Sequence, residues 1–527
     1  MAFQVSPGVA YSEVDLTTTI PTTSVSNAGF VGYFSQGPVD QVVTISSENE
    51  LVEIFGKPNS DNSSDWLTLS SFLAYGGTVQ VVRQVGATAV NAVEEGSTPE
   101  LIKNKTYFEN RNWNGITFAA RTAGDWANDL YVVILGDGHD TAATAYDVPK
   151  ITDNSDMHVF IVNGAVASGG VPISDNVVES FLWLSDDSTS KDGNGESNYY
   201  KNVINQKSKY VYAGGIDVDL TDADYTDGYH AIELNGGVNG SVQTKNYDIF
   251  LDTDQIEIDL VISGTDGGDA AVTLASTRRD CVAFVSPDLT DVNGTGDQDT
   301  KATAIIASQP STLNSYGVMD SGWKKMYDKY NDTWVQVPLN GDIAGLCTAT
   351  DESRGSWYSP AGFTRGKIRN CAGLLFDPNK ASRDKLYLSN VNPVASFPGE
   401  GYVLFGDKTL QTKPSAFDRI NVRRLFITLE KTISSSAKYS LFEFNDEFTR
   451  GQFKSSVEPY LRGIKAQRGI VDYLVVCDET NNPPSVVDNN EFVGDIFIKP
   501  ARSINYIQLN FVAVSTGVNF QEVVGAV

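Results

Sequence analysis

The sequence predicts a multidomain protein in which α/β units carry an inserted β-rich domain and an extended arm at each end. Its 527 residues exceed what one ordinary core contains. Strand-like and helical patterns alternate near the start and in the last third, as in α/β units, and short strand patterns among Gly, Asn, Asp and Ser fill the stretch between. We place an N-terminal arm at 1–21, an α/β domain at 22–90 plus 241–345, an inserted β-rich protruding domain at 91–240, a C-terminal α/β domain at 346–510 and a C-terminal arm at 511–527.

The first 21 residues hold too few apolar side chains to build a core. Val9, Tyr11 and Val14 stand among small and polar residues. The run TTTIP at 17–21 is a poor start for a helix, because it joins β-branched residues to a proline. We expect an extended segment here, and the mostly small residues of 515–527 predict the same for the other end.

The first α/β pattern follows directly after this arm. Strands are expected at 29–34 and 78–85, with two helices between them. Ser47 and Glu50 form a capping box that starts the first helix, and an apolar stripe predicts the second helix at 65–75. A strand, two helices and a strand make up an α/β unit.

A change in the amino-acid pattern marks the inserted domain. Short strand candidates at 132–135, 158–162 and 181–184 alternate with polar, glycine-rich segments, and helical periodicity is weak. The α/β pattern then returns with a buried strand at 278–285 and a helix at 301–308.

The last third has the most regular pattern. A hairpin is expected at 323–338, a helix at 417–433 and a helical region at 446–467, which Pro459 should kink or split. Three strand candidates complete this part, at 470–477, 492–498 and 507–513.

Charge and composition exclude several classes of function. Lys and Arg number 39 against 66 Asp and Glu, and a net charge of −27 argues against binding to nucleic acid or to anionic membranes. The sequence has no apolar run long enough for membrane insertion and no signal-peptide pattern at its start, so we expect folding in a cytoplasm. The four cysteines form no CxxC pair, which predicts buried, reduced thiols.

Groups that could carry catalysis are sparse, and we predict that the protein is not an enzyme and needs no cofactor or metal. The three histidines, His139, His158 and His230, lack partners at ligand spacing. Ser321 sits in a DSG triplet without the glycine that a nucleophile elbow needs before it.

Two loops resemble binding motifs only in part. The segment GFTRGKI at 362–368 has its first glycine one residue too close for a phosphate-binding loop and an isoleucine where Ser or Thr would hold magnesium. The acidic run at 222–228 has its glycine one position late for a calcium loop. An exposed turn and a solvated acidic loop are the better interpretations.

Many short motifs, in order and spacing, resemble the contractile tail sheath proteins of myovirus-type bacteriophages. The resemblance covers roughly the first ninety residues and the last two hundred and fifty. Its motifs are SPGVAYSEVD at 6–15, GPV at 37–39, ISSENELVEIF at 45–55, ARTAGDWAN at 120–128, WYSPAG at 357–362, VNPV at 391–394, FGDKTL at 405–410, INVRRL at 420–425, FEFN at 442–445 and DYLVVCD at 472–478.

The resemblance implies a structural subunit that polymerises as stacked hexameric rings around a tail tube and contracts to drive that tube through the host envelope. It implies other copies of the chain, the tail tube protein, and baseplate and tail terminator proteins as partners. It implies a place in the virion tail, assembly in the host cytoplasm, and neither nucleic acid nor membrane insertion. Two alternatives stay open: a β-rich virion binding or adhesin module, and the sheath of a related contractile injection system.

The two arms are the candidate connectors between subunits. An arm without a core can gain order by adding a strand to a neighbour's sheet edge, and we expect acceptor edges near 470–477 and 492–498. The candidate residues of this strand exchange are Val9, Tyr11, Val14, Val512, Val514, Val518 and Phe520.

A basic cluster in an otherwise acidic chain is the candidate surface for the tail tube. At helical spacing, Lys454, Arg462 and Lys465 would flank the apolar stripe of the helical region on one side, and Arg468 follows them. A plain solvated face explains the same pattern equally well.

Overall fold

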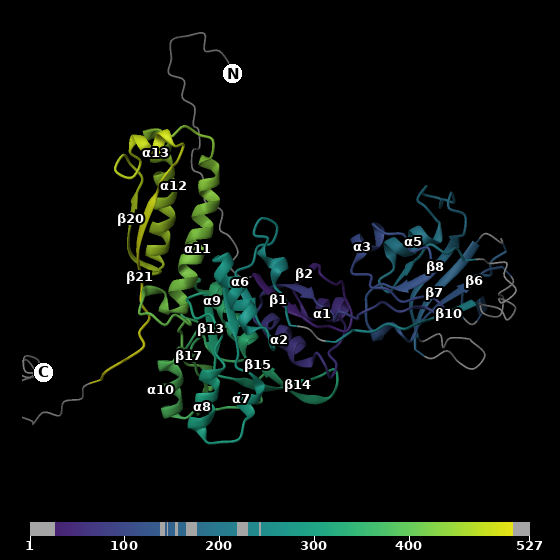
Figure 1. Ribbon diagram of the computed structural model, residues 1–527, viewed down its shortest axis with the longest axis horizontal. Helices are drawn as coiled ribbons and strands as arrows, with labels where there is room; N and C mark the ends of the chain where they lie inside the picture. Colours follow the sequence, from purple (N-terminus) through teal and green to yellow (C-terminus); the bar gives the residue numbers. More distant parts are fainter. Residues whose placement is uncertain are drawn as a thin grey trace, which may run out of the picture. The chain divides into compact units, whose positions relative to one another are not determined.

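The chain folds into two compact units, one ending at Phe442 and the other beginning at Glu443. The computed structural model describes residues 27–137, 143–144, 146–152, 156–164, 176–218, 230–241 and 244–509 (Figure 1). Both predicted arms therefore lie outside the described residues.

The first unit is built around a seven-stranded sheet in the order β17-β13-β12-β11-β1-β3-β2, in which only the β2–β3 pair is antiparallel. Helices lie between β11 and β12 and between β12 and β13, and longer segments, which include the second sheet between β3 and β11, connect the other parallel strands. The strands are β1 (Asn27–Gly32), β2 (Val42–Ile45), β3 (Thr78–Arg83), β11 (Leu260–Ile262), β12 (Val282–Val285), β13 (Gly317–Asp320) and β17 (Val391–Asn392).

Both faces of this sheet are covered. Neighbouring residues of β1 belong to different cores: Phe30 packs with α1 and α2 residues, and Val31 packs with α6 and α8 residues. The helices of the unit are α1 (Glu48–Phe55), α2 (Ser63–Leu73), α6 (Gly268–Arg278), α7 (Leu289–Asn293), α8 (Gln298–Ala307), α9 (Asn340–Ser353), α10 (Lys380–Leu388) and α11 (Ile420–Ala437), with short 3-10 turns at Asp248–Leu251, Ala416–Asp418 and Lys438–Ser440.

The predicted capping box is confirmed, with one difference. Ser47 is the N-cap of α1 and its side chain accepts a hydrogen bond from the Glu50 amide. The Glu50 carboxylate accepts from the amide and hydroxyl of Ser46, one residue before the N-cap.

The β-rich stretch forms a separate antiparallel sheet in the order β8-β7-β6-β10-β4-β5-β9. The three predicted strands at 132–135, 158–162 and 181–184 are confirmed as parts of β6, β7 and β8. The strands are β4 (Val93–Glu94), β5 (Phe118–Ala120), β6 (Leu130–Leu135), β7 (Asp156–Asn163), β8 (Val177–Ser185), β9 (Val211–Ala213) and β10 (His230–Asn235), accompanied by α3 (Lys105–Glu109), the 3-10 turn Asp125–Ala127 and α5 (Tyr200–Lys207).

The chain enters and leaves this second sheet at one place. Val90 and Val238 form an antiparallel bridge, and the Gly86 amide donates to the Asn239 carbonyl. A Cβ on Gly86 would lie 2.2 Å from the Ser241 carbonyl oxygen, so only glycine allows this close approach.

Arg83 joins the two sheets from the end of β3. Its buried guanidinium donates to the carbonyls of Phe34, Gly37 and Ser35 on one side, and to the Ala123 carbonyl and the Asn239 side chain on the other. No carboxylate of the described residues bonds to it, and burial lowers the pKa of this guanidinium to about 9.

Smaller sheets complete the first unit. The predicted hairpin at 323–338 is confirmed as β14 (Trp323–Asp328) and β15 (Thr333–Pro338), joined by β16 (Gly373–Leu374). A second hairpin consists of β18 (Val394–Phe397) and β19 (Gly401–Leu404). The predicted domain boundary at 345/346 falls inside α9, and β17 adds a later strand to the first sheet.

The second unit contains α12 (Glu447–Ala466), β20 (Ile470–Val476), α13 (Pro484–Asp488) and β21 (Asp495–Pro500). Pro459 was expected to kink or split the helical region; it does not split it, because α12 runs through it as one helix. The predicted strand at 507–513 is also wrong for 507–509, which have no regular structure, and its remainder lies outside the described residues. No described helix is long and apolar enough to span a membrane.

Among the described residues, three ion pairs of the first unit are buried on both sides, and in a fourth Asp259 is buried while Lys431 is 12% exposed. The Lys324 ammonium lies 2.8 Å from Asp342, and both side chains are fully buried. The pair also bonds to neutral groups: the Tyr75 hydroxyl donates to Asp342, and Lys324 donates to the Arg369 carbonyl. The other pairs are Lys245–Asp65, Arg424–Asp351 and Lys431–Asp259.

Asp320, at the end of β13, should make stability depend on pH. Burial raises its pKa to about 8, although Ser286 and the Gly322 amide donate to its carboxyl. An unfolded Asp titrates near ~4, so the folded state binds more protons between these values, and stability falls as pH rises from about 4 to about 8.

Asp320→Asn is expected to flatten part of this slope. The native chain should lose roughly 1–2 kcal/mol of unfolding free energy between pH 6 and pH 8 relative to the variant. Denaturant midpoints at several pH values measure the difference. Parallel slopes for the two chains would show that Asp320 keeps an ordinary pKa.

Candidate assembly surfaces

The second unit presents a two-stranded sheet supported by one helix. Phe453, Val457 and Leu461 form the buried stripe of α12, which packs on β20. Asp446 caps the helix by accepting from the Thr449 amide. Such a stripe at spacings of three and four residues is what an amphipathic helix needs.

The two strands of this sheet have outer edges that no other described strand pairs with. β20 and β21 are antiparallel, with Leu474 opposite Phe497 and a register shift near Asp472. Leu474 and Phe497, which face each other across the strands, are 57% and 59% exposed, and Val471, at the register shift, is 61% exposed. An open edge beside exposed apolar side chains is typical of a surface that accepts another strand.

The connection between these strands is held in place by one amide. The Asn482 side chain donates to the Val493 carbonyl and accepts from the Val493 amide. Phe453 meets Phe492 edge to face, with ring centroids 5.4 Å apart. The hairpin is therefore fixed on its helix before any partner binds.

The predicted basic residues of α12 lie on one side, and two of the four are paired. Lys454 lies 3.9 Å from Glu458 and Lys465 lies 2.9 Å from Asp472. Arg462 is exposed on the same helix and Arg468 follows the helix end; within the described residues neither forms an ion pair. A fifth basic residue of this region, Arg450, is buried and donates to the Asn445 side chain.

The predicted arm residues Val9, Tyr11, Val14, Val512, Val514, Val518 and Phe520 all lie outside the described residues. Of the sequence-predicted sites, the structure therefore places the acceptor strands and the basic residues. Strand exchange stays a prediction.

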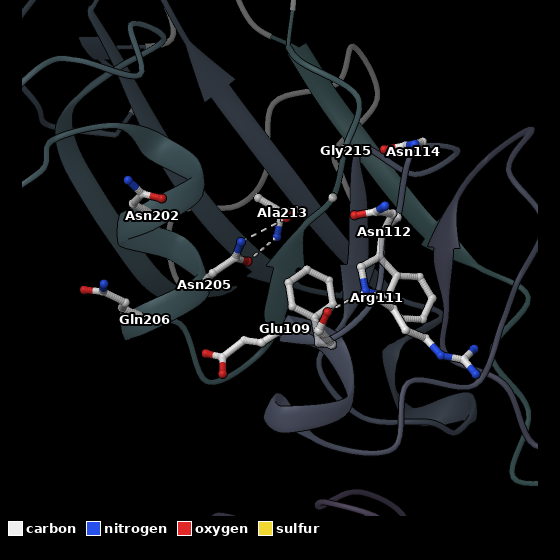
Figure 2. A pocket seen from close by; sticks show the side chains of 12 residues that line it. Glu109, Arg111, Asn112, Asn114, Asn202, Asn205, Gln206, Ala213 and Gly215 are labelled. Atoms are coloured by element: carbon white, nitrogen blue, oxygen red, sulfur yellow. Dashed lines mark hydrogen bonds between the residues drawn. The ribbon is translucent and has the colours of Figure 1, made fainter.

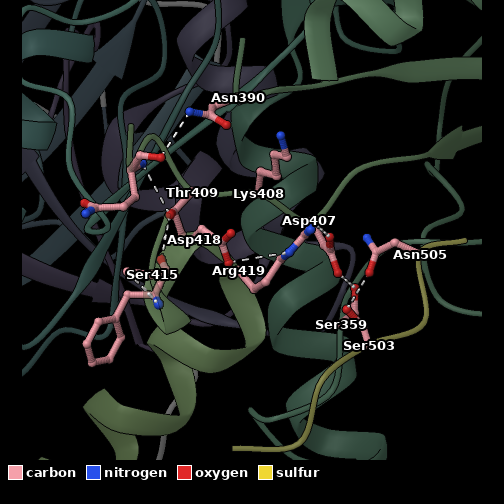
Figure 3. Close-up of polar contacts among 12 residues, drawn as sticks. Ser359, Asn390, Asp407, Lys408, Thr409, Ser415, Asp418, Arg419, Ser503 and Asn505 are labelled. Carbon is pink, nitrogen blue, oxygen red and sulfur yellow. Dashed lines mark hydrogen bonds and ion pairs between the residues drawn. The ribbon is translucent and has the colours of Figure 1, made fainter. Parts of the chain in front are cut away.

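The FGDKTL segment fixes the start of α11 through a polar cluster around Asp407 (Figure 3). Arg419 donates to Asp407 at 2.9 Å, and Ser359 donates to the other carboxylate oxygen. The Ile420 amide, the first of the helix, donates to the Asp407 carbonyl. The Thr409 hydroxyl donates to the Phe417 carbonyl, which is a second bond between this segment and the start of α11.

The groups that could resemble catalytic or ligand sites have structural roles. Ser321 is buried and accepts from the Val394 amide. His158 is buried between the Trp183 amide and the Pro149 carbonyl, and burial lowers its pKa. His139 lies outside the described residues.

The 362–368 segment is a turn held by its own backbone. The Gly366 amide donates to the Gly362 carbonyl, Lys367 pairs with Glu400, and Arg365 donates to the Ser359 carbonyl. Among the described residues, no group of His, Cys, Asp and Glu could hold a metal. Cys281, Cys347 and Cys477 are free and buried, and Cys371 is free and half-buried.

Sequence reasoning did not single out the apolar outer face of the hairpin. The sequence predicts strands around Val471, Leu474 and Phe497 but assigns them no buried or exposed face, because the pattern does not show how deeply a strand lies. Only the small size of the sheet, with two strands on one helix, leaves them exposed.

Three family models match the chain. They are the tail sheath protein Gp18 domain III N-terminal region at 27–83, the phage tail sheath protein central domain at 269–410 and the phage tail sheath C-terminal domain at 412–513. The tail sheath protein of Vibrio phage KVP40 is 32% identical, and that of Enterobacteria phage T4 is 30% identical; each alignment covers 99% of this chain and 99% of the relative.

Solved structures share the fold at low identity. The sheath complex of an extracellular contractile injection system in the contracted state has a TM-score of 0.54 at 13% identity, over 97% of this chain and 98% of that one. The sheath tail protein of Desulfitobacterium hafniense has a TM-score of 0.55 at 13% identity, over 93% and 100%. The α/β multidomain class is confirmed, and with full-length relatives at 30% identity and above, the chain belongs to the phage tail sheath protein family.

Proposed function

We propose that this tail sheath protein polymerises as stacked hexameric rings around a tail tube and contracts to drive the tube through a host envelope. Its membership of the family supports this role. The observation that carries the assembly mechanism is the hairpin of β20 and β21, which has two open edges and an exposed apolar face.

The arms are the proposed occupants of these edges. Two strands can accept one further strand on each side, which matches two arms donated by neighbouring subunits. Each added strand satisfies backbone groups and covers apolar side chains such as Leu474. Head-to-tail contacts of this kind are heterologous and generate a helical array.

Contraction then draws on energy stored in the lattice. The extended array is a kinetically trapped state, and contraction leads to a state with more buried interface between subunits. The strand links keep neighbours attached while the subunits rotate. The role is structural and requires neither catalysis nor a cofactor.

The partners are other copies of the chain, the tail tube protein, and baseplate and tail terminator proteins. The proposed location is the virion tail, with assembly in the host cytoplasm. Relatives that align over 99% of this chain are phage proteins, which favours a phage tail over another contractile injection system.

Negative-stain electron microscopy of the purified intact chain tests the assembly. We expect long hollow cylinders at high protein concentration. Small, uniform particles under every condition would contradict the polymerising role and favour a binding module.

Reversing the charges of Arg462, on α12, and Arg468, just after it, tests the proposed tube-facing side. Arg462→Glu with Arg468→Glu should weaken co-assembly with the tube protein, because unpaired cations are replaced by anions on an exposed surface. Lys413→Glu, at an exposed position of the first unit, is the control. Normal sheathed tubes from the double variant would show that this side faces solvent.

A further inference from the structure

The inserted domain contains a hollow that the assembly mechanism does not use. It encloses about 410 Å³ between α5, the loop after α3 and the end of β9 (Figure 2). This volume is in the range of small-molecule sites. We propose that the hollow binds a neutral saccharide of one or two sugar units.

The floor of the hollow is backbone held in a fixed position. The Gly214 amide donates to the Thr117 carbonyl and the Gly215 amide to the Trp113 carbonyl. A Cβ on Gly214 would lie 2.1 Å from the Ile116 carbonyl oxygen, so a side chain there would force the two segments apart. Lys201 of α5 donates to the Gly215 carbonyl and ties the helix to this floor.

One wall is a rigid stack of aromatic rings. Phe108 lies parallel to Tyr212 at 4.1 Å between centroids, and on its other side it is nearly parallel to Trp113 at 5.7 Å. The Trp113 indole donates to the Phe108 carbonyl, which fixes the outer ring of the stack. The rings of Phe108, Trp113 and Tyr212 are buried against one another, so they give the hollow a wall of fixed shape.

Carboxamides dominate the polar lining. Figure 2 shows Asn112 and Asn114 on the loop side and Asn202 and Gln206 on the helix side. Asn205 bonds to both the amide and the carbonyl of Ala213, which locks α5 against β9. Within the described residues, Asn112, Asn114 and Gln206 make no side-chain hydrogen bond to the protein, so their amides are free for a ligand.

This lining selects a neutral polar ligand. A carboxamide offers a donor and an acceptor together, which matches the dual character of a sugar hydroxyl. The lining carries one charge of each sign, Glu109 and Arg111; Glu109 lies 3.7 Å from Lys105, and the Arg111 guanidinium lies 4.3 Å over the Tyr107 ring. With no net charge, the lining favours neither an anion nor a cation.

Saturation-transfer NMR on the intact chain tests the proposal. The probes are galactose, N-acetylglucosamine and maltose, with methyl phosphate, whose methyl protons report binding, as the charged comparison. We expect transfer to at least one neutral sugar with millimolar affinity and none to methyl phosphate. Absence of transfer to all three sugars, or transfer to methyl phosphate in their place, would overturn the assignment.

Two variants locate the binding. Asn112→Ala with Asn114→Ala should weaken sugar binding at least about tenfold, since each removes a hydrogen-bonding group from the lining. Gln206→Trp should abolish binding by filling the hollow from an exposed helix position. Asn194→Ala, at an exposed asparagine outside the lining, is the control. Sugar binding that both variants retain would also overturn the proposal, and unchanged circular dichroism shows that each variant is folded.

Discussion

Removing either arm is expected to abolish cylinder formation while the folded subunit persists. One variant lacks residues 1–21 and the other ends at Asn510. Without an arm, the open edges of β20 and β21 receive no strand, and subunits lose the link that continues from one ring to the next. Sedimentation and electron microscopy would show small particles in place of cylinders.

A double variant of the hairpin tests the proposed acceptor surface while both arms are present. Leu474→Lys with Phe497→Lys places charge on the exposed face of the hairpin, where both side chains already contact solvent. We expect it to lose assembly as the truncations do, with unchanged circular dichroism. Asn489→Lys, an exposed position just after α13, adds the same kind of charge and should assemble normally. Cylinders from both truncated chains would discard strand exchange and leave the sheath role intact.

Lys324→Met is expected to destabilise the first unit by about 3–5 kcal/mol, since it leaves a buried carboxylate without its cation. Asp342 is fully buried, burial raises its pKa, and Lys324 opposes that shift. The Tyr75 hydroxyl alone cannot balance the charge. Denaturant midpoints followed by intrinsic fluorescence measure the loss.

The double variant Lys324→Met with Asp342→Leu should recover much of this loss, because an apolar pair of similar volume removes both desolvation costs. The exposed pair Lys329–Glu48 provides the control, where Lys329→Met should cost less than about 1 kcal/mol. A Lys324→Met chain as stable as the native one would show that the pair contributes no net stability.

The local elements of this fold could be predicted because their signals are local. Ser47 and Glu50 set the start of α1 within one turn, and the strand at 158–162 is apolar from Val159 to Val162. Pro459 does not split α12, because a proline removes one helical hydrogen bond, whereas the helix is held by a buried stripe on both sides of it. Tertiary packing outweighed a local penalty.

The assembly and binding surfaces depend on contacts between residues that lie far apart in the sequence, and the sequence alone does not predict these contacts. Glu458 lies four residues after Lys454, so that pairing follows from helical spacing, but the Lys465–Asp472 pair needs the turn between α12 and β20. The saccharide hollow needs β5 beside β9, which brings residues near 113 against residues near 215. The partners of Arg83 could not be predicted from residue types, because its acceptors are mostly backbone carbonyls.

The single point where the chain enters and leaves the second sheet has a consequence for protein engineering. Gly86 and Gly240 lie against each other, so the two ends of the second-sheet segment are close together where they join the first sheet. The alignment with the KVP40 relative extends over 677 positions, whereas this chain has 527 residues, so the alignment contains gaps in this chain. We expect that a foreign domain with closely spaced ends could be grafted between these two glycines while the first sheet keeps its fold.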